Sequence, residues 1–298
     1  MSWPLATSLS KTYLGAANAD DVEKVYLGAT QIFPSGGGGP SYDTATQALL
    51  DAATTDGYTA ASGSTLTALD AFITELKTEG IWTLLDALWL PATNGDSDFA
   101  TYNLKDPDSH QLTKVNSPTF TSGQGFTGGG TAYLNTNFNP STDGVNYTLN
   151  SAAAGIYQRT NSKVLDYKFG CVDSLGYRIA SLWNRPSSGN FAGINSSNPQ
   201  SSGLPNADLE NIGLNYINRN SDLVSIYADG VLFESVTQSD KSIVNEEVYL
   251  LGANDKGSLA VPSSDQISMA FIGGDLSSKA SGFYSAIQTY MTALGTQV

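Results

Sequence analysis

The chain of 298 residues is poor in three things that many enzymes and metal proteins need: cysteine, histidine and charge. It has one cysteine, Cys171, and one histidine, His110, and charged residues make up 14% of it. A single cysteine excludes an internal disulfide and a thiolate metal cluster. The apolar neighbours of Cys171 predict a buried core thiol rather than a reactive one.

The residues that serine hydrolase chemistry requires are also scarce. Such a site needs a base beside the nucleophile, and the only histidine lies in the segment Asp106-Pro-Asp-Ser-His110, whose composition is typical of a turn. There is no Gly-x-Ser-x-Gly motif in the chain. We therefore expect His110 to be a loop histidine exposed to solvent, not a catalytic base.

Positive charge is scarce as well. The 14 basic residues face 28 acidic ones, and the resulting net charge of -14 repels phosphate backbones and anionic lipid headgroups. No run approaches 18 apolar residues, and the opening Met-Ser-Trp-Pro lacks the basic start and apolar stretch of a secretion signal. The sequence predicts no nucleic-acid partner, no membrane partner and synthesis in a reducing cytoplasm.

What the chain does have is the composition of many short strands. Apolar residues make up 40%, and from residue 92 onward short β-branched and aromatic runs alternate with Gly, Asn, Asp and Pro at roughly ten-residue intervals. Asp229-Gly230 suits a two-residue hairpin turn. The predicted strands are Leu112–Phe120, Thr131–Leu134, Ala152–Gln158, Lys163–Phe169, Tyr177–Trp183, Asn211–Asn218, Leu223–Ala228, Val231–Ser235, Glu247–Leu251 and Gln266–Ile272.

Helices are predicted before and after these strands. Asp43 is a candidate N-cap for a first helix, and a second runs from Ser64 to a C-terminal Gly80. The apolar segment 81–90 fits a buried short helix or a strand. The chain closes with an amphipathic helix capped by Ser277 or Ser278, expected to pack on the helices before Pro91 or across the sandwich edge.

The first 41 residues differ from the rest. Lys24–Phe33 contains two strand-like runs around Leu27-Gly28, and a lone hairpin is marginal in water, so this piece is expected to pack on something else. Ser35–Ser41, with four consecutive glycines, has the composition of a flexible linker. The predicted division is 1–34, a linker 35–41, a helical region 42–91 and a sandwich with its C-terminal helix 92–298.

Several of these segments resemble known phage proteins. Lys24–Pro34 resembles the short N-terminal module of many phage tail and virion structural proteins, and Tyr227–Gly230 is similar to a hairpin of laminin-G-like domains. Four further segments are similar to a phage family with a concanavalin-like sandwich: Asp96–Lys105, Leu112–Phe120, Gly125–Gly128 and Ile272–Gly295. The likeness covers nearly the whole chain, and its motifs are structural rather than catalytic.

The resemblance implies a mainly β protein with a concanavalin-like antiparallel β-sandwich (jelly roll), an N-terminal β-hairpin attachment segment and a role in a virion. It implies a tail fibre, appendage or capsid decoration protein whose partners are other virion proteins, copies of itself and, in some relatives, host-surface polysaccharide. Attachment to the particle is expected through five apolar residues of the hairpin: Val25, Tyr26, Leu27, Ile32 and Phe33.

The sequence gives weaker support to a glycosidase site and to a calcium site. Glycosidases of this sandwich type use paired carboxylates, but no Glu-x-Asp-x-Glu motif is present and the nearest pair is Asp208-Leu-Glu210. Asn94, Asp96 and Asp98 supply oxygens at alternate positions, as an EF-hand opens, yet Phe99 and Lys105 stand where its glycine and glutamate belong. A looser calcium site and an Asx-type turn both stay open for 94–98.

Exposed aromatic side chains on a sandwich can stack on sugar rings. Four strand residues are candidates for such a patch, with core positions as the alternative: Tyr157, Tyr177, Trp183 and Tyr216. The leading hypothesis is thus a non-catalytic virion structural protein without a cofactor. The alternative is a host-glycan-binding adhesin, and a glycoside hydrolase is the third possibility.

Overall fold

The computed structural model describes residues 26–27, 30–31, 41–162, 164, 166–183, 191–196, 212–239 and 241–298. Of residues 26–27, 30–31, 180–183 and 191–192 it describes the backbone alone. The chain divides into two units, Met1–Tyr42 and Asp43–Val298.

The first unit contains a short antiparallel hairpin. β1 (Tyr26–Leu27) pairs with β2 (Thr30–Gln31), with Leu27 opposite Thr30. This confirms the hairpin predicted around Leu27-Gly28. Val25, Ile32 and Phe33 lie outside the described residues, so the attachment role of the hairpin stays a prediction.

The second unit contains the helices and the remaining strands. The α-helices are α1 (Thr44–Asp56), α2 (Gly63–Thr78), α3 (Pro140–Asp143) and α4 (Ala280–Ala293), and the 3-10 turns are η3 (Trp82–Leu84), η4 (Phe99–Thr101) and η6 (Ser277–Lys279). The strands are β3 (Leu85–Trp89), β4 (Thr113–Val115), β5 (Thr119–Thr121), β6 (Gly125–Thr127), β7 (Tyr133–Asn135), β8 (Ser151–Gln158), β9 (Phe169–Val172), β10 (Arg178–Trp183), β11 (Phe191–Ser196), β12 (Gly213–Asn220), β13 (Leu223–Ala228), β14 (Val231–Thr237), β15 (Tyr249–Leu250), β16 (Ala253–Asp255), β17 (Ser258–Ala260) and β18 (Gln266–Gly273).

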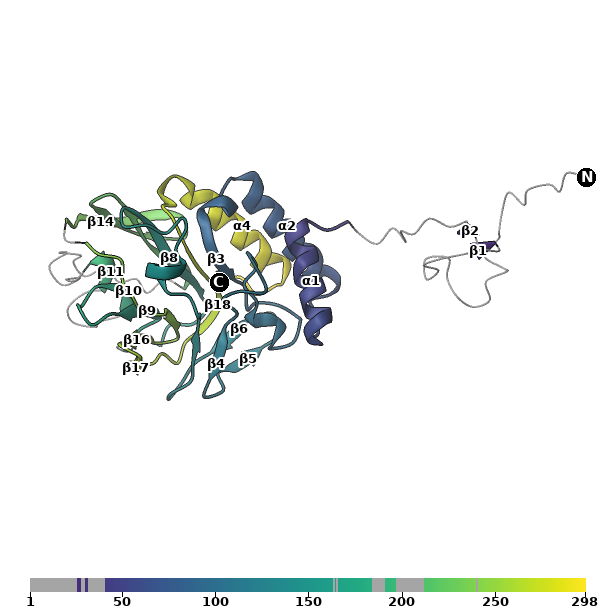
Figure 1. Ribbon diagram of the computed structural model, residues 1–298, viewed down its shortest axis with the longest axis horizontal. Coiled ribbons are helices and arrows are strands. Elements are labelled where there is room, and N and C mark those ends of the chain that lie inside the picture. Colours follow the sequence, from purple (N-terminus) through teal and green to yellow (C-terminus); the bar gives the residue numbers. More distant parts are fainter. Residues whose placement is uncertain are drawn as a thin grey trace, which may run out of the picture. The chain divides into compact units, whose positions relative to one another are not determined.

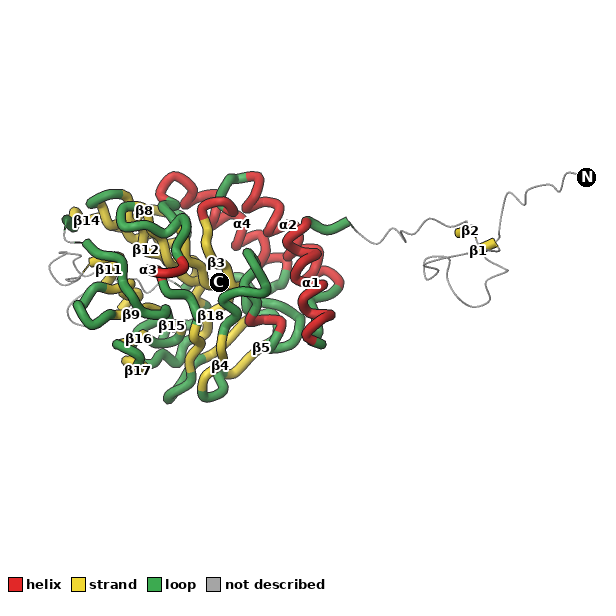
Figure 2. The backbone as a smooth tube through the Cα atoms, in the orientation of Figure 1, coloured by secondary structure: helices red, strands yellow, loops and turns green. Residues whose placement is uncertain are grey.

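Within the described residues of this unit the strands form two eight-stranded sheets. We call them the β8 sheet, in the order β14-β13-β12-β8-β18-β6-β5 with β3 also on β18, and the β9 sheet, in the order β11-β10-β9-β15-β7-β4 with β16 and β17 attached. All pairings are antiparallel except β16 with β9. The predicted fold class, a mainly β sandwich with helices before it and a C-terminal helix, is confirmed (Figure 2).

The hydrophobic core lies between the two sheets. Alternate residues of each strand point inward, as the period of two requires. Ile156, Ile217 and Ile226 come from the β8 sheet, and Phe169 and Cys171 come from the β9 sheet. The prediction that Cys171 is a buried core thiol is therefore confirmed, and its burial raises the pKa of the thiol well above the usual range.

A second apolar layer separates the β8 sheet from the helices. Helices α2 and α4 pack on each other, and Phe283 of α4 contacts Phe271 of β18 with ring centroids 4.8 Å apart. The ring centroids of Phe72 in α2 and Tyr290 in α4 lie 5.6 Å apart. The C-terminal helix thus packs on α2, one of the two positions predicted for it. The second unit has three layers: the helices, the β8 sheet and the β9 sheet (Figure 1).

Local signals account for the ends of several elements. The Asp43 side chain accepts a hydrogen bond from the Ala45 N–H and caps α1 as predicted. Asp229 and Gly230 both have positive φ, 48° and 76°, as a two-residue turn between β13 and β14 requires. Gly80, also predicted as a stop, has φ 69° directly after α2.

Some predicted strands are wrong in extent. Leu112–Phe120 is two strands in different sheets, because Asn116 and Ser117 adopt positive φ and Pro118 follows, so β4 and β5 separate there. The predicted strand Lys163–Phe169 has only its last residue in β9, which runs from Phe169 to Val172.

The segment 81–90 left open as helix or strand is a 3-10 turn followed by a strand. Its strand β3 pairs with β18, with Trp89 opposite Ala270. Because β3 belongs to the β8 sheet, the residues expected as a helical region, 42–91, share one compact unit with those expected as the sandwich, 92–298, apart from Tyr42.

Candidate functional site

The outer face of the β9 sheet presents polar and aromatic side chains where three short strands meet. In β7 the core residue Leu134 separates Tyr133 from Asn135, which are both half-buried and point outward. β7 pairs with β4 on one side and β15 on the other, which places Thr113 and Tyr249 opposite Asn135. We call this surface the β7 face and define it by Thr113, Tyr133, Asn135, Glu247 and Tyr249.

Two tyrosines form the aromatic part of the β7 face. The rings of Tyr133 and Tyr249 lie 4.5 Å apart with an interplanar angle of 30°. Burial of Tyr249 and a hydrogen bond between the two hydroxyl groups raise the pKa of Tyr249 well above its ordinary value. Tyr249 is 7% exposed and forms the base of the pair, while Tyr133 reaches the surface.

A carboxylate and an amide lie beside the ring pair. Asn135 Nδ2 donates to Glu247 Oε2 at 2.7 Å, so the amide orientation is fixed and its carbonyl oxygen faces away from the carboxylate. Glu247 is half-buried. The β7 face therefore combines a partly exposed aromatic ring with a charged acceptor and an amide, which together can contact apolar and hydroxyl surfaces of one ligand.

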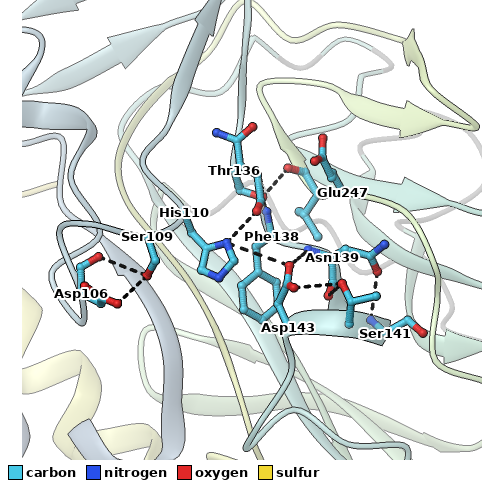
Figure 3. A network of polar contacts seen from close by, with 12 residues as sticks. Asp106, Ser109, His110, Thr136, Phe138, Asn139, Ser141, Asp143 and Glu247 are labelled. Atoms are coloured by element: carbon cyan, nitrogen blue, oxygen red, sulfur yellow. Dashed lines mark hydrogen bonds and ion pairs between the residues drawn. The ribbon is translucent and has the colours of Figure 1, made fainter.

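The chain leaves β7 through a polar network that contains His110 (Figure 3). Asn137, at φ 52°, donates from Nδ2 to the Gln111 carbonyl at 2.6 Å and to Thr113 Oγ1 at 2.9 Å. His110 Nδ1 donates to the Asn137 carbonyl at 2.6 Å, and Asp143 Oδ2 lies 4.0 Å from the same nitrogen. The network anchors the end of β7 to the loop that precedes β4.

The His110 network does not have the geometry of a serine hydrolase. Ser109 Oγ donates to Asp106 Oδ2 at 2.9 Å and points away from the imidazole (Figure 3). The prediction that His110 is an exposed loop histidine is wrong in its exposure. The side chain is 24% exposed and packs edge-on against Phe138 at 5.0 Å, because the left-handed backbone at His110 turns it inward.

The aromatic residues predicted as candidates for sugar stacking do not come together. Tyr157 and Tyr216 are fully buried on the helix-covered side of the β8 sheet, where Tyr157 Oη contacts Gln288 and Tyr216 stacks on Tyr227 at 4.8 Å. Their assignment to an exposed patch is therefore wrong, since α4 covers them. Tyr177 is half-buried beside β10 of the other sheet, and the side chain of Trp183 lies outside the described residues.

The oxygens of the predicted calcium candidates already have partners. Asn94 bonds both the N–H and the carbonyl of Ser62, at 3.0 and 3.1 Å. Asp96 accepts from the N–H groups of Thr59, Asp98 and Phe99, at 2.6, 3.0 and 2.8 Å. Burial alone would raise the pKa of Asp96, but these backbone donors lower it below its ordinary value.

The third candidate, Asp98, pairs with Lys114 Nζ at 2.7 Å. A cation at this loop would meet an ammonium group and N–H donors, so the residues act as an Asx-type turn that joins the α1–α2 connection to η4. Among the described residues, no three His, Cys, Asp or Glu side chains gather in a way that could hold a metal ion.

The nearest carboxylate pair in the sequence, Asp208 and Glu210, lies outside the described residues, so its role as a glycosidase pair stays untested. In the described part of the chain no helix combines the length and apolar character needed to cross a membrane.

The comparisons with known proteins identify similar folds only. No protein-family model matches the sequence, and no curated protein does so significantly. Trypanosoma rangeli sialidase in complex with 2,3-difluorosialic acid superposes with a TM-score of 0.49 at 11% identity, over 76% of this chain and 39% of the sialidase. The chain thus spans about two fifths of that protein's length.

Smaller sandwich domains are also similar. Domain 4 of the arabinanase AbnA from Geobacillus stearothermophilus, solved with arabinotriose, matches with a TM-score of 0.38 at 13% identity, over 67% of this chain and 98% of the domain. CBM40 of Ruminococcus gnavus IT-sialidase, bound to alpha2,3 sialyllactose, matches with a TM-score of 0.31 at 14% identity, over 42% of this chain and 76% of that chain.

The β7 face was not predicted from the sequence, although part of its signal is there. The triplet Tyr133-Leu-Asn135 alternates outward, core and outward side chains, and both segments, Thr131–Leu134 and Glu247–Leu251, are among the predicted strands. What the pattern lacks is the pairing of β7 with β15, which brings residues 112–116 positions apart into contact.

Proposed function

We propose that the protein is a non-catalytic carbohydrate-binding sandwich whose ligand lies on the β7 face. The main observation in support of this proposal is the Tyr133–Tyr249 ring pair directly beside the Asn135–Glu247 hydrogen bond. Sugars have an apolar ring face bordered by hydroxyl groups, so an aromatic surface next to a carboxylate and an amide matches both parts of one residue. Thr113 at the margin adds a hydroxyl.

The charge of the β7 face selects the class of sugar. Glu247 is its acidic side chain, Asp143 lies farther along the same network, and the net charge of the whole chain is -14. An anionic ligand would meet like charge, which disfavours binding. We therefore expect neutral hexose or amino-sugar polysaccharides to bind in preference to sialylated or uronic-acid polymers.

A glycan array with the full chain tests the proposal. We expect Tyr133→Ala to weaken binding of the best neutral glycan, because the lost apolar contact of about 1.5–3 kcal/mol corresponds to roughly tenfold to a hundredfold in affinity. Tyr58→Ala is the matched control, since Tyr58 is a half-buried tyrosine that also pairs with another tyrosine, Tyr102, at 5.7 Å, but in the helical layer.

Silence across neutral polysaccharides, or equal loss in the two tyrosine variants, would overturn the assignment of the β7 face. The same glycans incubated with the protein and analysed for new reducing ends test the absence of catalysis. Release of sugar would identify a glycoside hydrolase instead.

We further propose, on the resemblance of Lys24–Pro34 to phage attachment modules, that residues 1–34 hold the protein on a tailed-phage particle. The β1–β2 hairpin and the division of the chain at residue 42 support this arrangement. In this role the protein is a tail fibre, appendage or decoration component that displays the sandwich to host-surface polysaccharide. A chain lacking residues 1–34 should bind glycan normally but fail to enter particles, and normal incorporation would contradict the attachment role.

A further inference from the structure

A buried lysine lies between two carboxylates where the two sheets meet. Lys168 precedes β9 and is 3% exposed, Asp265 precedes β18 and is 1% exposed, and Asp166 is fully buried. Lys168 Nζ lies 2.6 Å from Asp166 Oδ1 and is in direct contact with Asp265 Oδ2. An amine and a carboxyl group that are 97 residues apart in sequence are thus held together out of water.

The surroundings of Asp265 distinguish its two oxygens. Oδ1 accepts from the Ser162 N–H at 2.7 Å and from Thr160 Oγ1 at 3.2 Å. Oδ2 is the oxygen in contact with the lysine, and its other donors are more distant: Ser162 Oγ at 3.3 Å, Gln158 Nε2 at 3.4 Å and Ser263 Oγ at 3.5 Å. Donors fixed on one carboxyl oxygen polarise the Cγ–Oδ1 bond and stabilise negative charge that develops there when a nucleophile attacks Cγ.

Asp166 is placed to move protons. Its Oδ1 faces Lys168 Nζ, and its Oδ2 accepts from Ser263 Oγ at 2.7 Å, which fixes the orientation of the carboxylate. Asp166 can take a proton from Nζ, and the Ser162 and Ser263 hydroxyls, which contact both Asp166 Oδ2 and Asp265 Oδ2, connect it to the oxygen that leaves. Groups held in this way react as if at very high concentration, since translational and rotational freedom has already been lost.

We propose that Lys168 and Asp265 condense spontaneously to an isopeptide bond that covalently joins the β9 sheet to the β8 sheet. Through Asp166 the ammonium gives one proton to Asp265 Oδ2, which leaves a neutral amine and a neutral carboxylic acid. Nζ attacks Cγ, and its second proton follows the same route to Oδ2. The Nζ–Cγ bond forms, the Cγ–Oδ2 bond breaks and one water leaves, while Asp166 returns to its carboxylate form.

The reaction also reduces the number of buried charges. Two opposite charges in the interior lose their hydration, and an ion pair recovers that cost only in part. The amide product is neutral, so Asp166 is the one charge left of the three, and it keeps Ser263 Oγ and the new amide N–H as donors. Oδ1 still accepts from Ser162 and Thr160. The cross-link requires no oxidant, metal or cofactor.

Mass spectrometry of the denatured full chain tests the proposal. We expect an intact mass lower than that calculated from the sequence by one water molecule, and a proteolytic peptide pair joined through Lys168 and Asp265. The full calculated mass in folded protein would show an ion pair only and overturn the proposal. A water loss mapped to another site, including a Lys168–Asp166 bond, would overturn it as well.

Variants test the roles of the three residues. Lys168→Arg keeps a buried cation and should have the full calculated mass, and Asp166→Asn should slow or abolish water loss while Lys168 and Asp265 stay in place. Lys241→Arg is the control, because Lys241 forms a 2.6 Å ion pair with Asp222 near the surface, and it should keep the water loss. Unchanged water loss in Lys168→Arg would sink the assignment, whichever variants fold well.

Discussion

The outward faces of the two sheets differ in whether a further layer covers them. On the β8 sheet, helix α4 covers aromatic side chains: its Phe283 packs on Phe271, which in turn packs on Tyr216. On the β9 sheet, Tyr133 and Asn135 stay half-exposed. The comparison teaches that an outward aromatic on a strand is a candidate ligand contact only when no further layer covers its sheet.

The largest expected effect of this difference is on the free energy of unfolding. Phe283→Ala empties a fully buried position between α4 and β18 and should lower the free energy of unfolding by about 3–5 kcal/mol. Tyr133→Ala, on the β7 face, should cost less than about 1 kcal/mol because its ring is already partly in water. Urea denaturation followed by fluorescence measures both.

Thr292→Ala is the control for the helix, since Thr292 is exposed on α4 and should change stability by less than about 0.5 kcal/mol. Equal costs for Phe283→Ala and Tyr133→Ala would break the comparison, since the two faces would then be equally important to folding.

A smaller effect is expected where the helical layer joins the sandwich. Asp96→Asn weakens the three backbone hydrogen bonds of the carboxylate and should cost about 1–2 kcal/mol at neutral pH, a value reduced by its partial exposure. Because the pKa of Asp96 is lowered in the folded protein, its contribution is present above about pH 4 and is lost as the pH falls through the folded pKa.

Unfolding free energies of Asp96→Asn and the parent chain at several pH values check this. The gap between their free energies of unfolding should narrow below pH 4. Asp255→Asn, at an exposed position, is the control and should change the free energy of unfolding at neutral pH by less than about 0.5 kcal/mol. A constant gap would mean that the carboxylate charge contributes nothing at this junction.

The smallest expected difference is between two substitutions of Asn137 at the end of β7. Asn137→Ala removes two side-chain hydrogen bonds and leaves a Cβ residue at φ 52°, so it should cost about 1–2 kcal/mol. Asn137→Gly loses the same bonds but relieves the left-handed backbone, and should be about 0.5–1 kcal/mol more stable than the alanine variant. Thermal melts of the pair measure the difference, and an alanine variant as stable as the glycine variant would contradict the backbone argument.

Much of the fold could be predicted because its signals are local. The Asp229-Gly230 turn, the cap at Asp43 and the inward–outward alternation of β8 and β13 depend on residues within a few positions of one another. The break at Asn116-Ser117 was missed although Asn, Ser and the following Pro118 are common in turns, because the residues on either side were assigned to one strand. Which sheet β4 and β5 each join depends on pairing with other strands.

The candidate site was less predictable. Tyr157 and Tyr216 have the same strand patterning as Tyr133, and nothing near them in sequence indicates that α4, more than 60 residues later, covers their side of the sheet. Likewise the contact of Tyr133 with Tyr249 depends on the pairing of β7 with β15.

The sequence alone determined the secondary-structure class and the chemical character of the chain. It is mainly β, with an acidic surface, one inert thiol and helices at either end of the sandwich. Tertiary structure alone decided which outward face stays open and which buried charges meet, as Lys168 and Asp265 do. The physical reason is that alternation and turn chemistry act over a few residues, whereas the covering of a sheet depends on contacts between segments that are far apart in the chain.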